Sequence, residues 1–187
     1  MRPSVYISSS LNNSYVVLNE QVRSNQSTNI NTNFSYNLNL KDKLDLTLSA
    51  APSWQSSIIP SLQSKSTSIN QTYAIEWWVA PFKRIWFDGK YTYRRQNFTS
   101  VHSVPTEFSL WNMAVTWLVM KENRGQLRLS VFDLLGQNRN TTRTSTVNEL
   151  TYSYVNAVTR YYMLSFVYNF NSFHKPGREK RGFSFWY

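Results

Sequence analysis

The sequence contains no cysteine, two histidines and five glycines among its 187 residues. The absence of cysteine excludes disulfide bonds, thiolate catalysis and cysteine-based metal sites. His102 and His174 fall in a predicted loop and in the C-terminal tail, so neither a histidine metal site nor a Ser-His-acid triad is predicted. The glycines form no phosphate-binding pattern. We therefore predict no catalytic residues, no metal and no cofactor, and we do not expect an enzyme.

The sequence also has no long apolar run. A transmembrane helix needs about 18 or more such residues, and Glu76 interrupts even the most apolar stretch, 74–82. The first ten residues lack the apolar core of a secretory signal. A transmembrane helix is therefore excluded, and an outer-membrane protein would need a signal upstream of this sequence.

Instead, the sequence is rich in residues that favour strands, and they follow a two-residue alternation. It contains 7 Trp, 12 Tyr and 11 Phe. From 30 to 40, mainly apolar residues alternate with Asn and Ser, which predicts a strand with one apolar and one polar face. This segment is longer than a soluble strand of about 5–6 residues and matches the roughly 9–11 residues of a tilted strand that crosses a bilayer. The pattern favours a membrane barrel over a sandwich.

The same alternation predicts seven strands, with two weaker ones near 3–11 and 14–20. The seven are expected at 28–40, 44–54, 66–80, 85–97, 107–120, 125–134 and 157–170. Short turns are expected at 12–13, 41–43, 81–84 and 121–124, and longer links near 20–27, 55–65, 98–106 and 135–156. Alternating short and long connections are typical of an up-and-down membrane barrel. The predicted fold class is all-β, an antiparallel up-and-down meander of about nine long strands that is part of a transmembrane β-barrel.

The two faces of these strands predict lipid outside and water inside. The apolar positions alternate with polar ones that include three acids, which are Glu76, Asp88 and Asp133. We expect these acids to be lumen charges that cations on neighbouring strands balance, namely Lys90, Arg94 and Arg128. The Asn and Ser side chains of 28–40 predict a wide lumen or one that a plug fills. Five aromatic residues around one short turn predict part of an aromatic girdle: Trp77, Trp78, Phe82, Trp86 and Phe87.

The formal net charge is +10. The basic residues are spread over predicted turns, strand ends, the polar face and the tail 171–187. Such a surplus is typical of a solvated surface, and it can also meet anionic headgroups. No recognition motif accompanies the charge, so nucleic acid is not a predicted partner.

Two segments near the end of the chain carry a family resemblance. The first runs from Leu127 to Asn138 and contains Phe-Asp-Leu-Leu-Gly-Gln-Asn; the second, 159–170, contains Arg-Tyr-Tyr-Met-Leu and ends on an aromatic residue. In this order, with a polar loop between them, they resemble the last two strands of TonB-dependent-receptor-like outer-membrane β-barrel proteins of Gram-negative bacteria. The specific part of the resemblance covers about 45 residues, and the earlier strands match in pattern only.

The resemblance implies a barrel of about 22 strands with an N-terminal plug domain. It also implies import of a bulky nutrient across the bacterial outer membrane, energised by an inner-membrane complex. On this hypothesis residues 1–170 are the C-terminal segment of the barrel, and 171–187 are a basic and aromatic tail beyond the usual closing aromatic, here Phe170. The expected partners are membrane lipid, the remainder of the barrel, the plug domain and the energising complex.

Ligand capture is expected from the loops near 55–65, 98–106 and 135–156, without assignment of individual residues. Two alternatives stay open. The chain could be a small self-closed barrel, in which 3–11 pairs with 157–170. It could also be a soluble all-β module that binds carbohydrate on its Trp and Tyr faces.

Overall fold

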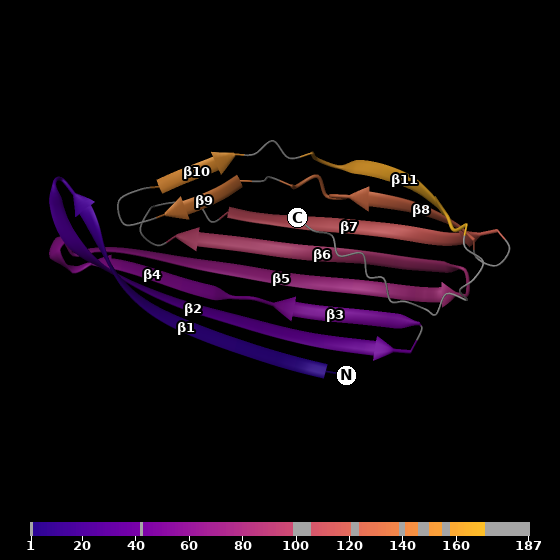
Figure 1. Ribbon diagram of the computed structural model, residues 1–187, viewed down its shortest axis with the longest axis horizontal. Coiled ribbons are helices and arrows are strands. Elements are labelled where there is room, and N and C mark those ends of the chain that lie inside the picture. Colours follow the sequence, from indigo (N-terminus) through magenta and orange to yellow (C-terminus); the bar gives the residue numbers. More distant parts are fainter. Residues whose placement is uncertain are drawn as a thin grey trace.

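The structure is a computed structural model, and it describes residues 2–41, 43–98, 106–120, 124–138, 141–145, 150–154 and 158–170. The chain is all-β, and nine strands form one antiparallel sheet (Figure 1). The sheet strands are β1 (Arg2–Leu18), β2 (Gln21–Leu40), β3 (Leu44–Ala50), β4 (Ser53–Ile59), β5 (Ser64–Phe82), β6 (Ile85–Phe98), β7 (Thr106–Val119), β8 (Gly125–Phe132) and β11 (Tyr161–Tyr168). The predicted antiparallel meander of about nine strands is therefore confirmed.

Strands β3 and β4 share one position in the sheet, because both lie between β2 and β5. They are separated at Ala51 and Pro52, where proline has no N–H to donate. The Ala51 N–H donates to the Thr72 carbonyl at 2.7 Å, and the Thr32 N–H donates to the Pro52 carbonyl at 3.0 Å, so the two neighbours stay attached. The prediction of one strand over 44–54 was therefore wrong, because proline divides it.

The prediction of a long link at 55–65 was also wrong. Strand β4 continues to Ile59, the single 3-10 turn η1 (Pro60–Leu62) follows, and β5 begins at Ser64. Gln63 closes this turn in the left-handed region, with φ of 51°, and its N–H donates to the Pro60 carbonyl at 3.1 Å. The connection is tight because a polar sequence here extends both strands rather than forming a loop.

Strands β1 and β2 form a long hairpin, which corrects two further predictions. The predicted turn at 12–13 lies inside β1, where Asn12 faces Ser27 and Asn13 faces Gln26, and most of the predicted link 20–27 belongs to β2. The actual turn consists of Asn19 and Glu20, with φ of 48° and 62°. Two consecutive positive φ values are typical of the two-residue type I′ hairpin, whose twist matches that of the flanking strands.

The β8 strand ends at a turn in which Asp133 and Gly136 both have positive φ, 49° and 65°. The predicted loop 135–156 contains the hairpin of β9 (Thr141–Ser145) and β10 (Leu150–Tyr154), which corrects that prediction. In Figure 1 this hairpin lies beyond the ends of β8 and β11. The predicted short turn 81–84 is confirmed between Phe82 and Ile85, whereas most of 98–106 and 121–124 lies outside the described residues.

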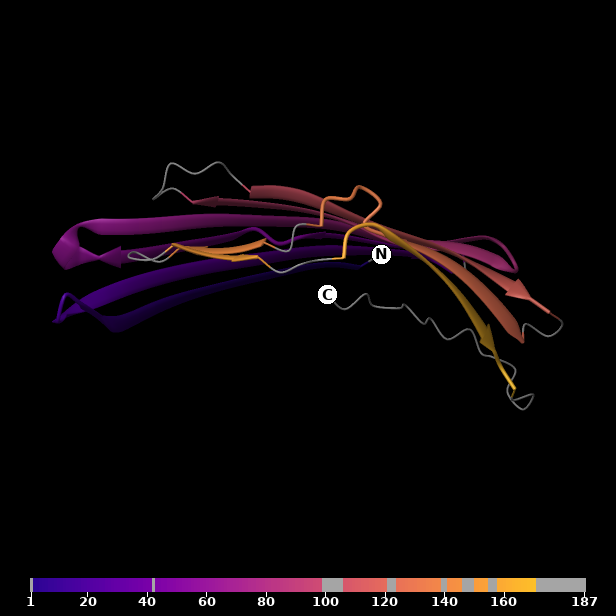
Figure 2. The same cartoon turned by 90° about the horizontal axis from the view of Figure 1, so that it is seen from above.

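The sheet forms a single bent layer (Figure 2). Its order runs from β1 to β11, and each of these outer strands has one hydrogen-bonded neighbour within the described chain. A self-closed barrel requires a ladder between 3–11 and 157–170, and the described residues form no such ladder. Four hydrophobic residues of the described chain are buried: Ile59, Ala74, Phe98 and Ala114. The sheet holds together through its ladders and same-face contacts rather than through a core between layers.

Candidate functional site: a sheet with one apolar and one charged face

The strand register places apolar side chains in rows across one face of the sheet. One row consists of Leu44, Val79, Phe87, Val115, Leu129 and Leu164. The next consists of Leu46, Trp77, Gly89, Met113, Val131 and Tyr162. Many of these side chains are solvent-accessible: Leu164 is 68% exposed and Leu129 is 45% exposed. The predicted apolar face thus exists, and it is not buried between two stacked sheets in the described part of the chain.

On β6 and β7 the apolar face ends at an ion pair. On β6 it runs from Ile85 to Tyr93, and at the next same-face position Arg95 forms an ion pair with Glu107 on β7, 3.1 Å from Nε to Oε1. At about 3.4 Å per residue, the apolar run spans about 27 Å along the strand. A tilted strand crosses the apolar part of a bilayer with roughly 9–11 residues. The nine residues from Ile85 to Tyr93 therefore match the number that a tilted strand needs to cross a membrane.

Aromatic side chains gather near the charged boundary. Tyr73 and Tyr93 stack with ring centroids 6.4 Å apart, and Tyr91 meets Trp111 edge-on at 6.5 Å. All four belong to the two last apolar rows before the Arg95–Glu107 pair. Aromatic rings of this kind prefer the level of lipid headgroups.

The aromatic cluster predicted around the β5–β6 turn divides between the two faces. Trp77 and Phe87 lie in the apolar rows, whereas Trp78 is in register with Asp88, and Trp86 with Thr116. The prediction of a single girdle was wrong for Trp78 and Trp86, because adjacent strand residues point to opposite faces.

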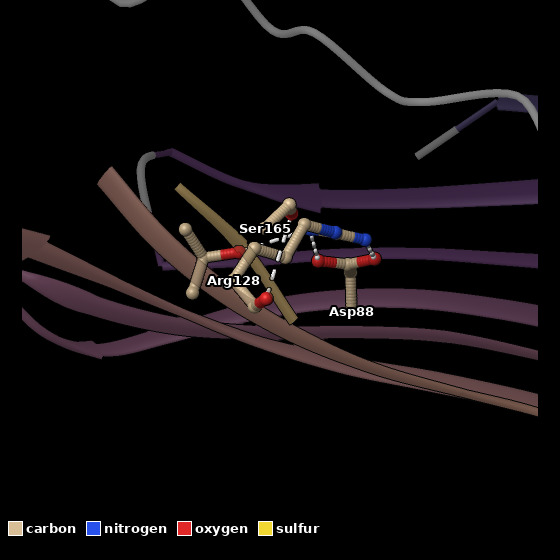
Figure 3. Close-up of polar contacts among 4 residues, drawn as sticks. Asp88, Arg128 and Ser165 are labelled. Carbon is tan, nitrogen blue, oxygen red and sulfur yellow. Dashed lines mark hydrogen bonds and ion pairs between the residues drawn. The ribbon is translucent and has the colours of Figure 1, made fainter. Parts of the chain in front are cut away.

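The opposite face carries an ion pair that spans three strands. Arg128 on β8 donates to both carboxylate oxygens of Asp88 on β6, at 2.7 and 2.6 Å, and also to Thr116 Oγ1 on the intervening β7 at 2.9 Å (Figure 3). The Ser165 hydroxyl on β11 donates to the Arg128 carbonyl at 3.5 Å. The Arg128 and Asp88 side chains are 13% and 18% exposed, and Thr116 beneath them is fully buried. Two parallel hydrogen bonds from a guanidinium group to one carboxylate fix the orientation of the arginine side chain.

Polar contacts continue along this face toward β2. Lys90 pairs with Glu76 at 2.6 Å. The Asn37 amide donates to Asp45 Oδ1 at 3.1 Å and to Thr47 Oγ1 at 2.9 Å, and the Asn39 amide donates to Asp45 Oδ2 at 2.9 Å. The predicted balance of Glu76 by a cation of the neighbouring strand is confirmed, whereas Asp88 is balanced by Arg128 from two strands away. Sequence reasoning missed Asp45, although its position between Leu44 and Leu46 placed it on the polar face.

Two other predicted lumen charges behave differently. Asp133 is 3% exposed and accepts the backbone N–H groups of Gln137 at 3.0 Å and Asn138 at 2.9 Å, so it organises its own turn. Its N–H donates to Asn112 Oδ1 at 2.9 Å, which ties this turn to β7. Arg94 lies over the Phe108 ring at 5.8 Å. The prediction that cations balance Asp133 and that Arg94 balances an acid was therefore wrong for the described contacts.

The described residues contain no group of three potential metal ligands. Within the same ranges, no helix has the length and hydropathy to span a membrane. Both histidines, His102 and His174, lie outside the described residues. Of the segments predicted to capture ligand, 55–65 is strand and η1, and 98–106 lies almost entirely outside the described ranges.

A scan of protein-family models finds no match to this chain, and searches of curated proteins and of solved structures find none either.

Proposed function

We propose that this chain forms part of the wall of a bacterial outer-membrane β-barrel, with its apolar face against lipid and its charged face toward a water-filled or plugged lumen. The observation that carries the proposal is the apolar band of β3 and β5–β8, which ends on β6 and β7 at the Arg95–Glu107 pair. Outward-facing apolar bands about 25 Å tall, flanked by aromatic rings, are typical of such barrels.

The two outer strands support a role within a larger wall. β1 and β11 each present an edge without a second neighbour in the described chain, and a bilayer offers no water to such edges. Each unpaired backbone group in hydrocarbon costs several kcal/mol. We therefore propose that further barrel strands pair with both edges.

The resemblance of 127–138 and 159–170 to the end of TonB-dependent-receptor-like barrels supplies the transport hypothesis. On that hypothesis the wall surrounds a plug domain, and the connections at the β1–β2 end of the sheet lie outside the cell. An inner-membrane complex then energises the import of a bulky nutrient through the plug.

The absence of cysteine allows a direct test of the lipid-facing assignment. Single cysteines at Leu46, Thr47, Leu48 and Ser49 sample both faces of β3, which lies inside the sheet. Each variant of the full chain, in lipid vesicles, is labelled with a small fluorophore and exposed to a quencher confined to acyl chains. We expect strong quenching at 46 and 48 and weak quenching at 47 and 49, because successive residues alternate between faces.

The same four variants separate a membrane wall from a soluble carbohydrate-binding module. A soluble module would stay monodisperse without detergent and would show no quenching by acyl chains at any position. Either result would contradict the proposed function. Equal quenching at all four positions would contradict the assignment of the two faces.

A further inference from the structure

Positive charge is concentrated at one rim of the sheet. The β2–β3 connection contains Lys41 and Lys43, the β5–β6 turn consists of Lys83 and Arg84, and Arg124 immediately precedes β8. These connections lie together at the right-hand end of the sheet in Figure 1. At the opposite end, the β1–β2 turn of Asn19 and Glu20 and the β4–β5 connection 60–63 contain one acid and no base. The β8–β11 connection at that end, 133–160, contains three bases and two acids. The excess of bases over acids is therefore larger at the end formed by the β2–β3, β5–β6 and β7–β8 connections.

Backbone hydrogen bonds hold each basic turn against a neighbouring strand. The Lys43 carbonyl accepts the Ala80 N–H at 2.8 Å, and the Arg84 carbonyl accepts the Leu118 N–H at 2.8 Å. The Arg124 carbonyl accepts the Asn169 N–H at 2.9 Å. Because strands lie about 4.8 Å apart and each turn joins two positions of the sheet, successive turns are about 10 Å apart. The cations therefore form a regularly spaced row.

Exposed apolar side chains lie directly beside this row. Leu40 is 51% exposed, Phe82 65% and Met120 50%, and each adjoins one of the basic turns in the sequence. Lysine and arginine place their apolar stems along such surface while the charged ends reach toward a polar layer. An apolar band that ends in cations fits the boundary between acyl chains and phosphate headgroups.

We propose that the basic rim, defined as Lys41, Lys43, Lys83, Arg84 and Arg124, binds the phosphates of anionic phospholipid headgroups at the short-turn end of the sheet. This inference rests on the proposed membrane location and adds a lipid class to it. Charge complementarity carries it, since connections 41–43, 83–84 and 121–124 contain six basic residues against two acids, Asp42 and Glu122, and adjoin the apolar band. Each lysine or arginine near an anionic membrane surface adds to the attraction.

The test compares association of the full chain with vesicles of phosphatidylcholine alone and of phosphatidylcholine with about one-third phosphatidylglycerol. A rim variant combines Lys41→Gln, Lys43→Gln, Lys83→Gln and Arg84→Gln, and a companion with the three lysines changed to arginine keeps the charge. The control variant combines Arg23→Gln and Lys65→Gln, which remove cations away from this rim. We expect the wild type to prefer anionic vesicles by about tenfold or more, and the preference to fall as salt rises.

The rim variant should lose most of this preference but keep its association with neutral vesicles, while the arginine companion and the control keep both. Equal affinity of the wild type for both vesicles would overturn the lipid assignment and leave the membrane proposal intact. An equal loss in the control would also overturn it. If inorganic phosphate lowers the preference for anionic vesicles more than chloride does at matched ionic strength, the result would assign the rim to free anions instead of lipid. Failure of the wild type to associate with either vesicle would overturn both proposals.

Discussion

Arg128 reaches diagonally across β7 to hold both carboxylate oxygens of Asp88, two strands away. The residues of β7 that lie between them are small: Thr116 is fully buried and Ala114 is 6% exposed. Small side chains on the middle strand leave room for the long guanidinium side chain to lie along the sheet. This pair therefore connects β6, β7 and β8 through side chains in addition to their backbone ladders.

Removal of either partner of this pair should destabilise the sheet. Arg128→Ala leaves a largely buried carboxylate unpaired, and we expect it to lower the free energy of unfolding by about 2–3 kcal/mol. Asp88→Ala should have a similar effect, and the double variant should cost much less than the sum of the two. The measurement is a double-mutant cycle by urea unfolding in detergent micelles.

The Glu76–Lys90 pair provides the matched control for that cycle. Its side chains are 51% and 35% exposed, so solvent screens the pair and its coupling should stay below about 1 kcal/mol. Equal coupling in the two cycles would contradict a special role for the bridge across β7.

Trp77 covers Gly89 on the neighbouring strand, at the middle of the apolar face. A Cβ at position 89 would lie 2.8 Å from Trp77 Cε2 and 2.9 Å from the Asn112 carbonyl oxygen. Gly89→Ala should therefore displace the indole and lower the free energy of unfolding by about 1–3 kcal/mol. Unfolding titrations measure the loss, and near-ultraviolet circular dichroism reports the tryptophan environment.

A Trp77→Ala background separates the indole contact from the backbone contact at this position. Without the indole, Gly89→Ala should cost at least about 1 kcal/mol less, because only the Asn112 carbonyl remains close. An unchanged cost in both backgrounds would show that the backbone contact alone requires glycine.

The sequence predicted the apolar-faced strands well and the polar hairpin poorly. Hydrophobicity alternates strictly over 44–48, and over 111–117 it alternates except at Ala114; this pattern is local enough to read without a structure. In 21–29 both faces of β2 are mostly polar, so alternation gives no signal, and pairing with β1 and β4 determines the strand. The same reason explains why 55–65 was predicted as a loop.

The charged face was predictable where partners lie directly opposite or one row apart on strands with clear alternation, as for Glu76 and Lys90. The contacts of Asp133 were not predictable, because this residue lies where β8 ends and its backbone adopts positive φ. Alternation carries no information on a side chain once the strand ends. Its role in the turn depends on the N–H groups of Gln137 and Asn138.

Substitutions at Asp133 should rank by how well they keep this turn. Asp133→Asn retains one acceptor oxygen and tolerates positive φ, so it should cost least. Asp133→Gly tolerates φ but loses both acceptors, and Asp133→Ala loses the acceptors and adds backbone strain of about 1–3 kcal/mol. In urea titrations we expect the loss of stability to increase from Asp133→Asn through Asp133→Gly to Asp133→Ala. A variant Asp133→Ala that is as stable as Asp133→Gly would contradict a contribution from the φ of 49°.

The β1–β2 turn offers a substitution that should increase stability. Glu20 has φ of 62°, a region in which glycine is not strained, and an Asn-Gly pair is the preferred type I′ turn. We expect Glu20→Gly to raise the free energy of unfolding by about 0.5–1 kcal/mol and to slow amide hydrogen exchange along β1 and the facing part of β2. Gln21→Gly is the control, since Gln21 begins β2 and pairs with Leu18, so glycine there should weaken the hairpin. Faster exchange in Glu20→Gly than in the wild type would mean that this turn does not set the register of the hairpin.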